Sequence, residues 1–427
     1  MYALAFISGA ASAQQRPQPA GSDLSTDTLR LTRRQAIATA LLANPLIEIA
    51  RQQLLQVRAQ RVEGVAIPDP ALTASLDQQP AFLRLGDAAA RNVNLGLGIP
   101  FPDKFRLRNA IGVANIRTSE EQFRLQQQQL AAQAGRSYDS VLVTRLHRRD
   151  LTEARRLSAD FLLRTQARFD AGSVPRLDVI KAQVDLAQAD NDLIANARDV
   201  ANSEAALNRV LGRPLGASVS PMDSLEVPAP LPDLGAIVMM ALRSRPELTG
   251  LEAQQRAARA NSSLTRELAI LPDLTLSASR DFAQDVGTLY SLGLAMPIPV
   301  FFWQHTRGDF AERYHRELEL AAAYRDTRAA VGQDVRATFA AADAALRQVV
   351  FLRDHLLPSA REAYRVATVS YGLGGLSALD VLDARRTLLS AESQYADALA
   401  AANSTRSDLE RAAGAPLATF APGAPRE

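Results

Sequence analysis

The sequence FDAGSVPRLDVIKA, residues 169–182, returns in outline as YGLGGLSALDVLDA, residues 371–384. In both segments an aromatic residue precedes a glycine-containing turn, and Leu-Asp-Val then opens an apolar pattern with helical spacing. Glycine tolerates the left-handed backbone of a tight turn, so each segment predicts a turn that joins two helices. A pair of such segments about 200 residues apart indicates an internal repeat, which decides the fold.

Four more pairs of segments match in the same order and at a similar spacing. They are residues 36–45 with 236–246, 69–77 with 273–281, 95–102 with 292–299, and 211–215 with 413–417. The chain is therefore predicted to hold two copies of one half, 31–220 and 234–417, joined by the proline-rich linker 221–233.

The two ends of the chain fall outside this repeat. Residues 1–30 read as a signal-like segment and a disordered lead-in, because Tyr2–Ala13 is small and apolar and Ala11-Ser12-Ala13 fits a signal-peptidase site. A flexible tail is the alternative interpretation of this segment. Residues 418–427 are predicted to be a disordered tail.

Each half is predicted to contain a helix of about 35 residues, two short strands, a very long outgoing helix, the glycine turn and a long return helix. The outgoing helices, about 104–170 and 303–370, would each be ~100 Å long at 1.5 Å per residue. The return helices carry a heptad seam, a narrow apolar stripe that packs against one neighbour. Its members include Val179, Ala182, Leu186, Val381, Ala384 and Leu388. Helices of this length fit a tube wall or a free coiled coil.

The strands alternate between apolar and polar residues, which is typical of a sheet with one face of each kind. Leu72, Ala74 and Leu76 alternate with polar residues, as do Leu292 and Leu294 in the second half. A half-buried soluble sheet is one interpretation. If the apolar faces meet lipid, however, four strands cannot close a barrel, since closure takes about eight, and lipid tolerates no open edge. Several subunits would then have to pool their strands.

Composition narrows the function. The formal net charge is +2, which gives no indication of a nucleic-acid partner, and the chain has no cysteine, which excludes disulfides and thiol chemistry. The four histidines lie singly, and no nucleophile elbow, phosphate loop or Ser/His/Asp grouping is present. We therefore expect no catalysis, no cofactor and no metal site.

With the repeat and the turns in view, residues 31–417 resemble the TolC family of outer-membrane efflux proteins. The most specific part of the resemblance is the pair of turn motifs, residues 168–179 and 370–384. It implies a mainly α fold with a small β part. Two long antiparallel helical hairpins would form an α-barrel tunnel, and four strands per subunit would contribute to a shared trimeric transmembrane β-barrel. A homotrimer in the cell outer membrane would export substrate passively, supplied by a periplasmic adaptor and an inner-membrane pump of the RND type. The competing hypothesis is a soluble coiled-coil scaffold.

The resemblance also implies a pore gate at Asp380 and Asp383, one helical turn apart near the second turn. For Asp380, a helix-capping role is an equal alternative. A closed-state link between Tyr371 and Asp178 is implied as well. A second such link falls on Leu376 and Leu177, which cannot make it, so the closed state would rest on fewer polar contacts or on contact between these leucines.

The turn residues Arg168, Gly172, Gly374 and Gly375 are expected to meet the adaptor, since in the family this end of the molecule does so. A turn without a partner is the plainer interpretation. The stretch 296–308 is similar to a segment of heavy-metal efflux members, which favours metal ions as cargo and leaves drugs open.

Overall fold

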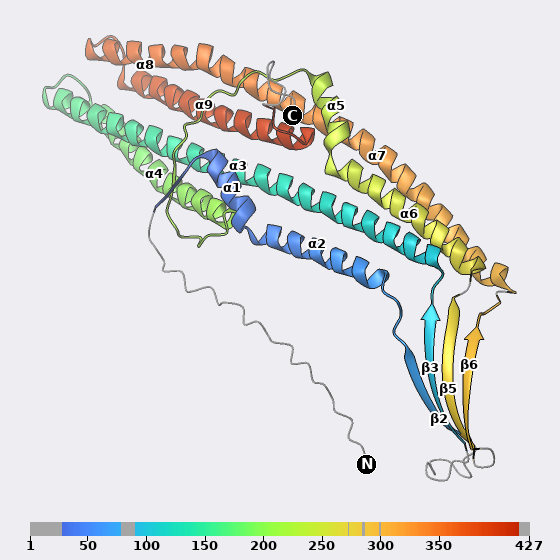
Figure 1. Ribbon diagram of the computed structural model, residues 1–427. Coiled ribbons are helices and arrows are strands. Elements are labelled where there is room, and N and C mark those ends of the chain that lie inside the picture. Colours follow the sequence, from blue (N-terminus) through green and yellow to red (C-terminus); the bar gives the residue numbers. More distant parts are fainter. Residues whose placement is uncertain (1–27, 78–89, 272, 284–286, 299, 418–427) are drawn as a thin grey trace, which may run out of the picture.

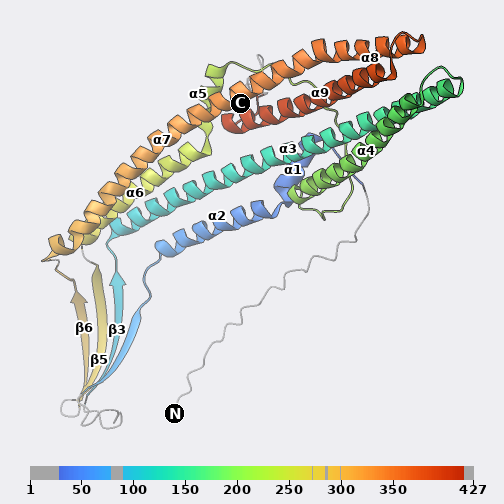
Figure 2. The same ribbon diagram turned by 180° about the vertical axis from the view of Figure 1, so that it is seen from behind.

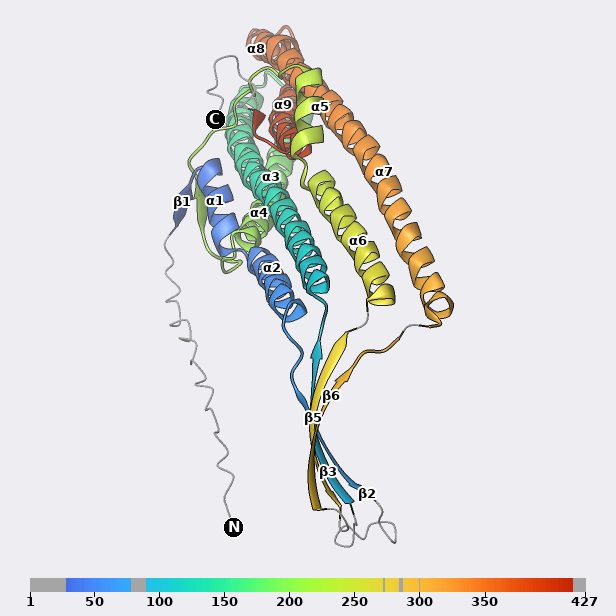
Figure 3. The same cartoon turned by 45° about the vertical axis from the view of Figure 1, so that its right-hand side comes forward.

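The computed structural model describes residues 28–77, 90–271, 273–283, 287–298 and 300–417. The predicted tail and all but the last three residues of the predicted lead-in lie outside these ranges. The molecule is elongated, with its helices running side by side along its length and four strands projecting from one end (Figures 1 and 2). Figure 3 shows α2, α3, α6 and α7 side by side above the sheet.

The two halves repeat the same order of elements, as the sequence predicts. In the first half these are α1 (Arg33–Ala43), α2 (Pro45–Gly64), β2 (Ala71–Asp77), β3 (Ala90–Ile99), α3 (Pro102–Asp170) and α4 (Arg176–Val210). In the second half they are α5 (Leu234–Ser244), α6 (Pro246–Ile270), β5 (Leu274–Ala283), β6 (Gly287–Ala295), α7 (Phe302–Phe351), a π-helical turn (Leu352–Leu356), α8 (Leu357–Gly372) and α9 (Ala378–Ala413).

The first helix of each half is not one helix of about 35 residues, so that prediction is wrong. It is broken at Asn44-Pro45 in the first half and at Arg245-Pro246 in the second. Proline has no N–H and disfavours a helical backbone in the residue before it, so both breaks fall at the residue before proline. Asn44 then caps α2 by accepting a hydrogen bond from the Leu46 N–H at 2.8 Å.

The second outgoing helix is also interrupted, where a continuous helix over 303–370 was expected. A π-helical turn, Leu352–Leu356, separates α7 from α8, and Pro358 lies in the first turn of α8. Without an N–H, Pro358 cannot bond the carbonyl one turn earlier, and a π turn is one way to absorb that loss. The first outgoing helix, α3, has no such interruption.

The four predicted strands are confirmed and form one antiparallel sheet in the order β2-β3-β5-β6. Its register places like residues opposite one another. One row across the sheet is apolar and consists of Leu72, Leu95, Ala278 and Leu292. The next row is polar and consists of Thr73, Asn94, Ser279 and Ser291. The sheet thus has one apolar and one polar face, and its outer strands β2 and β6 have open edges.

A short parallel pair was not foreseen. β1 (Leu29–Leu31) pairs with β4 (Val219–Pro221), so the lead-in ends in a strand and the linker begins in one. The Tyr138 hydroxyl donates to the Leu31 carbonyl at 3.0 Å, which fastens this pair to α3. Each of these strands has only three residues, which is too few for an alternating pattern to be recognised in the sequence.

The hydrophobic cores of the two halves lie where α1 and α5 cover the long helices. At the helix breaks, different side chains in the two halves donate to the end of the return helix. Asn44 donates to the Val210 carbonyl at 2.7 Å, and Arg245 donates to the Ala412 carbonyl at 3.2 Å. Each return helix therefore has a C-terminal carbonyl satisfied by the side chain that precedes the proline.

Candidate functional site

The two hairpin tips, residues 171–175 and 373–377, lie at the end of the molecule opposite the sheet (Figures 1 and 2). Gly172 and Gly374 have φ angles of +72° and +81°, so the turns require glycine there for backbone reasons. A side chain at either position would meet no atom within 4 Å. Both glycines and Gly375 are exposed, so the turns offer backbone rather than side chains to any partner.

Asp380 caps the helix that follows the second turn. Its Oδ2 accepts from the Ser377 N–H at 2.9 Å and from the Ser377 hydroxyl at 2.7 Å, and the Asp380 N–H donates to Ser377 Oγ at 3.4 Å. The Ser377 hydroxyl, and then its backbone N–H, lower the pKa of Asp380. This reciprocal capping box holds Asp380 ionised and fixed in direction at the tip.

Asp383 lies one turn further along α9 and is exposed. In the part of the chain that the structure describes, its carboxylate makes no hydrogen bond or ion pair. Residues three apart share a helix face, so two carboxylates stand together there, one fixed by a cap and one free.

Tyr371 fastens the second tip to the first, through partners other than the expected one. Its ring lies under the Arg168 guanidinium, 4.5 Å from the ring centre, and 5.5 Å from the Phe161 ring. Arg168 also donates to the Tyr371 carbonyl at 2.8 Å, and the hydroxyl lies 3.5 Å from Thr165 Oγ1. Among the described residues no hydrogen bond joins Tyr371 to Asp178, so the structure does not bring the predicted link together.

Two further expectations about the tips change with the structure. Arg168, expected at the surface for an adaptor, is half-buried and engaged with Tyr371. Leu177 and Leu376 are exposed by 57% and 39%, so they do not supply a well-packed apolar contact within one chain. A second polar link between the two hairpins therefore has to be made by other residues.

A buried ion pair that the sequence analysis missed joins the two hairpins. The Arg385 side chain, 4% exposed, donates to the Asp185 carboxylate and to the Ala154 carbonyl. Ser158 Oγ donates to the same Asp185 carboxylate at 2.8 Å. These four residues, the Arg385 cluster, tie α9 to α3 and α4. The sequence shows only that Arg385 lies between the seam residues Ala384 and Leu388, and it does not indicate the partner.

A second polar cluster lies further from the tips, between α3, α8 and α9. Burial raises the pKa of Asp150. Burial, and then the Asp150 charge, raise the pKa of Glu392. Arg361 lies 3.7 Å from Glu392, and His147 Nε2 lies 3.3 Å from Asp397 Oδ1.

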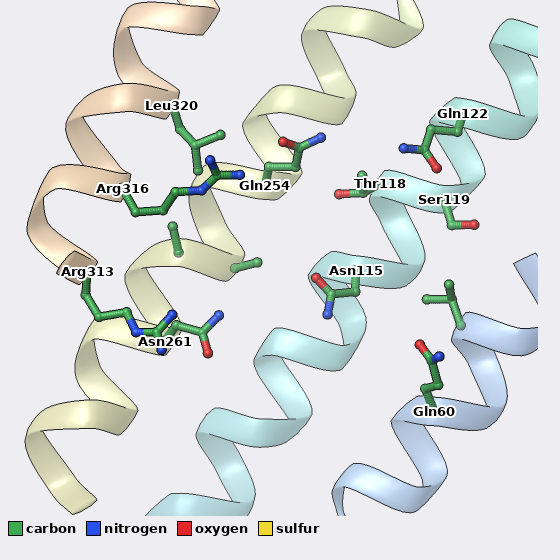
Figure 4. Close-up of a pocket in the computed structure, with 13 residues that line it drawn as sticks. Gln60, Asn115, Thr118, Ser119, Gln122, Gln254, Asn261, Arg313, Arg316 and Leu320 are labelled. Carbon is green, nitrogen blue, oxygen red and sulfur yellow. The ribbon is translucent and has the colours of Figure 1, made fainter. Parts of the chain in front are cut away.

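A polar groove of about 400 Å³ runs across the helices nearer the sheet. Figure 4 shows amide and hydroxyl side chains of α2, α3 and α6 around it, with two arginines of α7. The labelled side chains include Gln60, Asn115, Thr118, Gln254, Asn261, Arg313 and Arg316. Such a lining suits water and dissolved solutes more than an apolar ligand.

None of the described helices is both long and apolar enough to cross a membrane. No group of three or more His, Cys, Asp or Glu side chains there is arranged to hold a metal ion.

Comparison with known proteins identifies the family. The model of the family described as outer membrane efflux protein matches residues 36–213 and again 237–415. The chain belongs to the outer membrane efflux protein family. The two matched stretches correspond to the two repeats, and the resemblance to TolC is confirmed.

Individual relatives agree. The chain is 23% identical to the cobalt-zinc-cadmium resistance protein CzcC of Cupriavidus metallidurans over 397 residues, 90% of each chain. It is 28% identical over 267 residues to the pyoverdine export outer membrane protein OpmQ of Pseudomonas aeruginosa, 60% of this chain and 55% of that one. The solved outer-membrane channel OprN superposes with a TM-score of 0.76 at 19% identity, covering 90% of both chains.

The efflux protein is thus an outer-membrane channel with a helical periplasmic part, and it is not an enzyme. Channels of this family are trimers that work with adaptor proteins and inner-membrane pumps. The competing hypothesis of a soluble coiled-coil scaffold is wrong.

Proposed function

We propose that three copies of this efflux protein close a single duct, each giving four strands to a twelve-stranded barrel and one section of the tunnel wall. The observation that carries the proposal is the sheet, with an apolar and a polar face and open edges at β2 and β6. Four strands are about half of what closure needs, and lipid tolerates no open edge. Neighbouring copies satisfy both edges, and the apolar face then meets outer-membrane lipid.

The assembly is tested by fractionating cells and purifying the protein in detergent. A trimer in the outer membrane that conducts ions in planar bilayers supports the duct. A monomer that conducts nothing after reconstitution contradicts it.

The polar groove of Figure 4 is proposed to line the aqueous passage. Because the chain has no cysteine, single cysteines are unambiguous probes. Asn115→Cys and Gln254→Cys should react with a charged thiol reagent and lower the conductance of the reconstituted channel. Reaction at both sites without any change in conductance would place the groove on the outer wall.

The hairpin tips are proposed to form the gate. Threefold symmetry would gather Asp380 and Asp383 of each copy, six carboxylates, around the closed mouth, where they favour cations. Arg168 and the Arg385 cluster hold the second hairpin against the first. A contact between Tyr371 and Asp178, which the described part of this structure does not contain, is proposed as a further link of the closed state. The exposed turns at Gly172, Gly374 and Gly375, shaped by Arg168, are proposed to receive the adaptor.

For cargo we propose divalent metal ions delivered by an RND-type pump. The support is the match to CzcC over 90% of both chains and the similarity of residues 296–308 to metal-efflux members. Deleting the gene should raise sensitivity to cobalt, zinc or cadmium, and the intact gene should restore resistance. A strain that becomes sensitive only to organic compounds would favour the alternative, export of drugs or of compounds such as the pyoverdine named for OpmQ.

A further inference from the structure

Two arginines stand on the mainly apolar face of the sheet. Register places Arg91 beside Phe282, and Val93 beside Arg280, whose other neighbour is Tyr290. Arg91 and Arg280 are therefore diagonal neighbours on adjacent strands, within reach of one another's long side chains. The Arg280 guanidinium lies 6.0 Å from the centre of the Tyr290 ring. We refer to Arg91 and Arg280 as the outer arginine pair.

The pair lies at the end of the sheet farthest from the helices. The helical part is periplasmic, so this end faces the cell exterior. Arg91 is eight residues from Ile99, the last residue of β3, which is ~26 Å along a strand and ~20 Å along the axis of a tilted barrel. That distance corresponds to the apolar band of a membrane barrel, and it places the pair at the outer edge of the band.

Neither arginine has an anionic partner within the described ranges, although both side chains are exposed. They are also the only lysine or arginine residues in the four described strands. At the helix end, by contrast, Lys104 is buried and paired with Asp273 at 2.6 Å. Among the described strand residues, therefore, the unpaired cations are Arg91 and Arg280, at the exterior end of this face.

Assembly does not cover the pair. Arg91 and Arg280 belong to β3 and β5, the two central strands, so pairing of β2 and β6 with neighbouring copies leaves their face open. The polar face carries Asn92 and Asp281, which bond to one another, and so forms the water-filled side. The outer arginine pair then points toward the outer leaflet, where an unpaired charge is costly unless it meets an anion.

We infer that the outer arginine pair binds the headgroup phosphate of an anionic lipid of the outer leaflet, with Tyr290 supporting Arg280 at the interface. Guanidinium groups match phosphate oxygens in pairs, and aromatic rings gather at the same depth of a barrel wall. This inference rests on the proposed barrel. It adds a lipid-binding site on the outer wall, separate from the passage for cargo.

The test uses the full channel purified in detergent and titrated with two lipids that share acyl chains, bis-phosphorylated lipid A and its dephosphorylated form. Binding is followed by native mass spectrometry. The channel should prefer the phosphorylated lipid. At about fivefold for each arginine near a membrane surface, Arg91→Gln with Arg280→Gln should weaken its binding roughly thirtyfold and leave the dephosphorylated lipid unaffected.

The matched control is Arg209→Gln with Arg259→Gln, which removes the same charge from exposed positions on the helices. It should bind like the wild type. Equal affinity of the wild type for both lipids, or unchanged binding by the Arg91 and Arg280 variant, would overturn the inference. Failure of the barrel itself looks different, because a chain that is not a closed barrel conducts no ions and distinguishes neither lipid.

Discussion

The two halves of the chain are alike at the level of the short helices and differ at the hairpin tips. Near the helix breaks, Asn44 and Arg245 each donate a hydrogen bond to a C-terminal carbonyl of a return helix. Gly212 and Gly414 follow the return helices with φ angles of +69° and +73°. Toward the tips, α3 is continuous, whereas α7 and α8 are separated by a π-helical turn before Pro358. The middle of the molecule thus keeps the symmetry of the repeat, and the tips depart from it.

The differences at the tips concern charge as well as backbone. The second return helix starts with a capping box and carries Asp380 and Asp383, where the first starts at Pro175 without a side-chain cap and carries Asp178 and Lys181. Arg385 reaches across from the second half, where the first has Gln183 at the matching place. A duplicated hairpin can build a wall with equal halves, but a movable gate needs one hairpin to differ from the other.

The largest effect is expected from breaking the Arg385 cluster. Arg385→Met removes one member of a buried ion pair and leaves Asp185 buried without its partner, which should destabilise each subunit by about 3–5 kcal/mol. Thermal unfolding of the purified channel measures this loss. In planar bilayers the same variant should spend more time open, since the second hairpin loses its tie to the first.

Arg386→Met is the matched control, because Arg386 is the exposed neighbour of Arg385. It should behave like the wild type. A partial recovery of stability in Arg385→Met with Asp185→Leu would show that the stranded carboxylate causes the loss, since apolar replacement of a whole buried pair is often nearly neutral. Equal thermal midpoints for Arg385→Met and Arg386→Met would mean that the Arg385 cluster does not stabilise the contact between the two hairpins.

A smaller effect should follow from making the second outgoing helix resemble the first. Pro358→Ala restores a backbone donor where α3 has Arg156, so the π-helical turn should give way to continuous α-helix. Removing proline from a helix should raise the stability by about 1 kcal/mol, part of the full cost of an interior proline. If the π turn is the hinge of the gate, the open probability should fall. A gain in stability with unchanged gating would place the hinge elsewhere.

Much of this fold follows from the sequence because its signals are local. The alternating strands and the glycine turns each depend on neighbours within a few residues, and the repeat is found by aligning the two halves of the sequence. All three were confirmed. The helix breaks are also encoded locally, by Pro45 and Pro246, but the predicted helix of about 35 residues ran across both prolines. The short pair β1 and β4 and the partners of Tyr371 depend on segments far apart in the chain.

The Arg385 cluster shows most clearly why part of the site could not be predicted. An arginine between two seam positions is compatible with an exposed side chain that reaches past the stripe. Only the crossing of α9 over α3 and α4 decides that Arg385 is buried and that Asp185, 200 residues away, is its partner. Asp380 and Asp383, in contrast, were singled out by the family resemblance, and their spacing on one helix shows that both carboxylates share a face.

A still smaller change in stability should separate the two acids of the tip. Asp380→Ala removes a capping contact and should lower the thermal midpoint slightly, whereas Asp383→Ala removes a free carboxylate and should leave it unchanged. Both should reduce cation selectivity and block by divalent cations if both line the closed mouth. If Asp380→Ala alters stability without altering selectivity, Asp380 is a cap and the gate charge belongs to Asp383.

The smallest effect concerns pH and again separates tip from middle. The pKa values of Asp150 and Glu392 are raised in the folded state, so above their ordinary values of 3.8 and 4.5 the folded state holds protons that the unfolded state has released. The free energy of unfolding should therefore fall as the pH rises from these ordinary values through the raised pKa values. The pKa of Asp380 is lowered, so its contribution is present above 3.8 and is lost only in stronger acid. As the pH falls toward these ordinary values, therefore, acid should stabilise the contact of α3 with α9 and leave the cap intact.

The charges that face this pair include His147, Arg149 and Arg361, which lower the pKa of Asp150, and Glu153, which raises that of Glu392. Acidification from neutral pH toward 4.5, the ordinary value of Glu392, should raise the thermal midpoint slightly, and Glu392→Gln should remove most of that rise. Glu362→Gln changes an exposed glutamate whose pKa is lowered, and should retain it. A rise that survives in Glu392→Gln would assign the effect to groups other than Glu392.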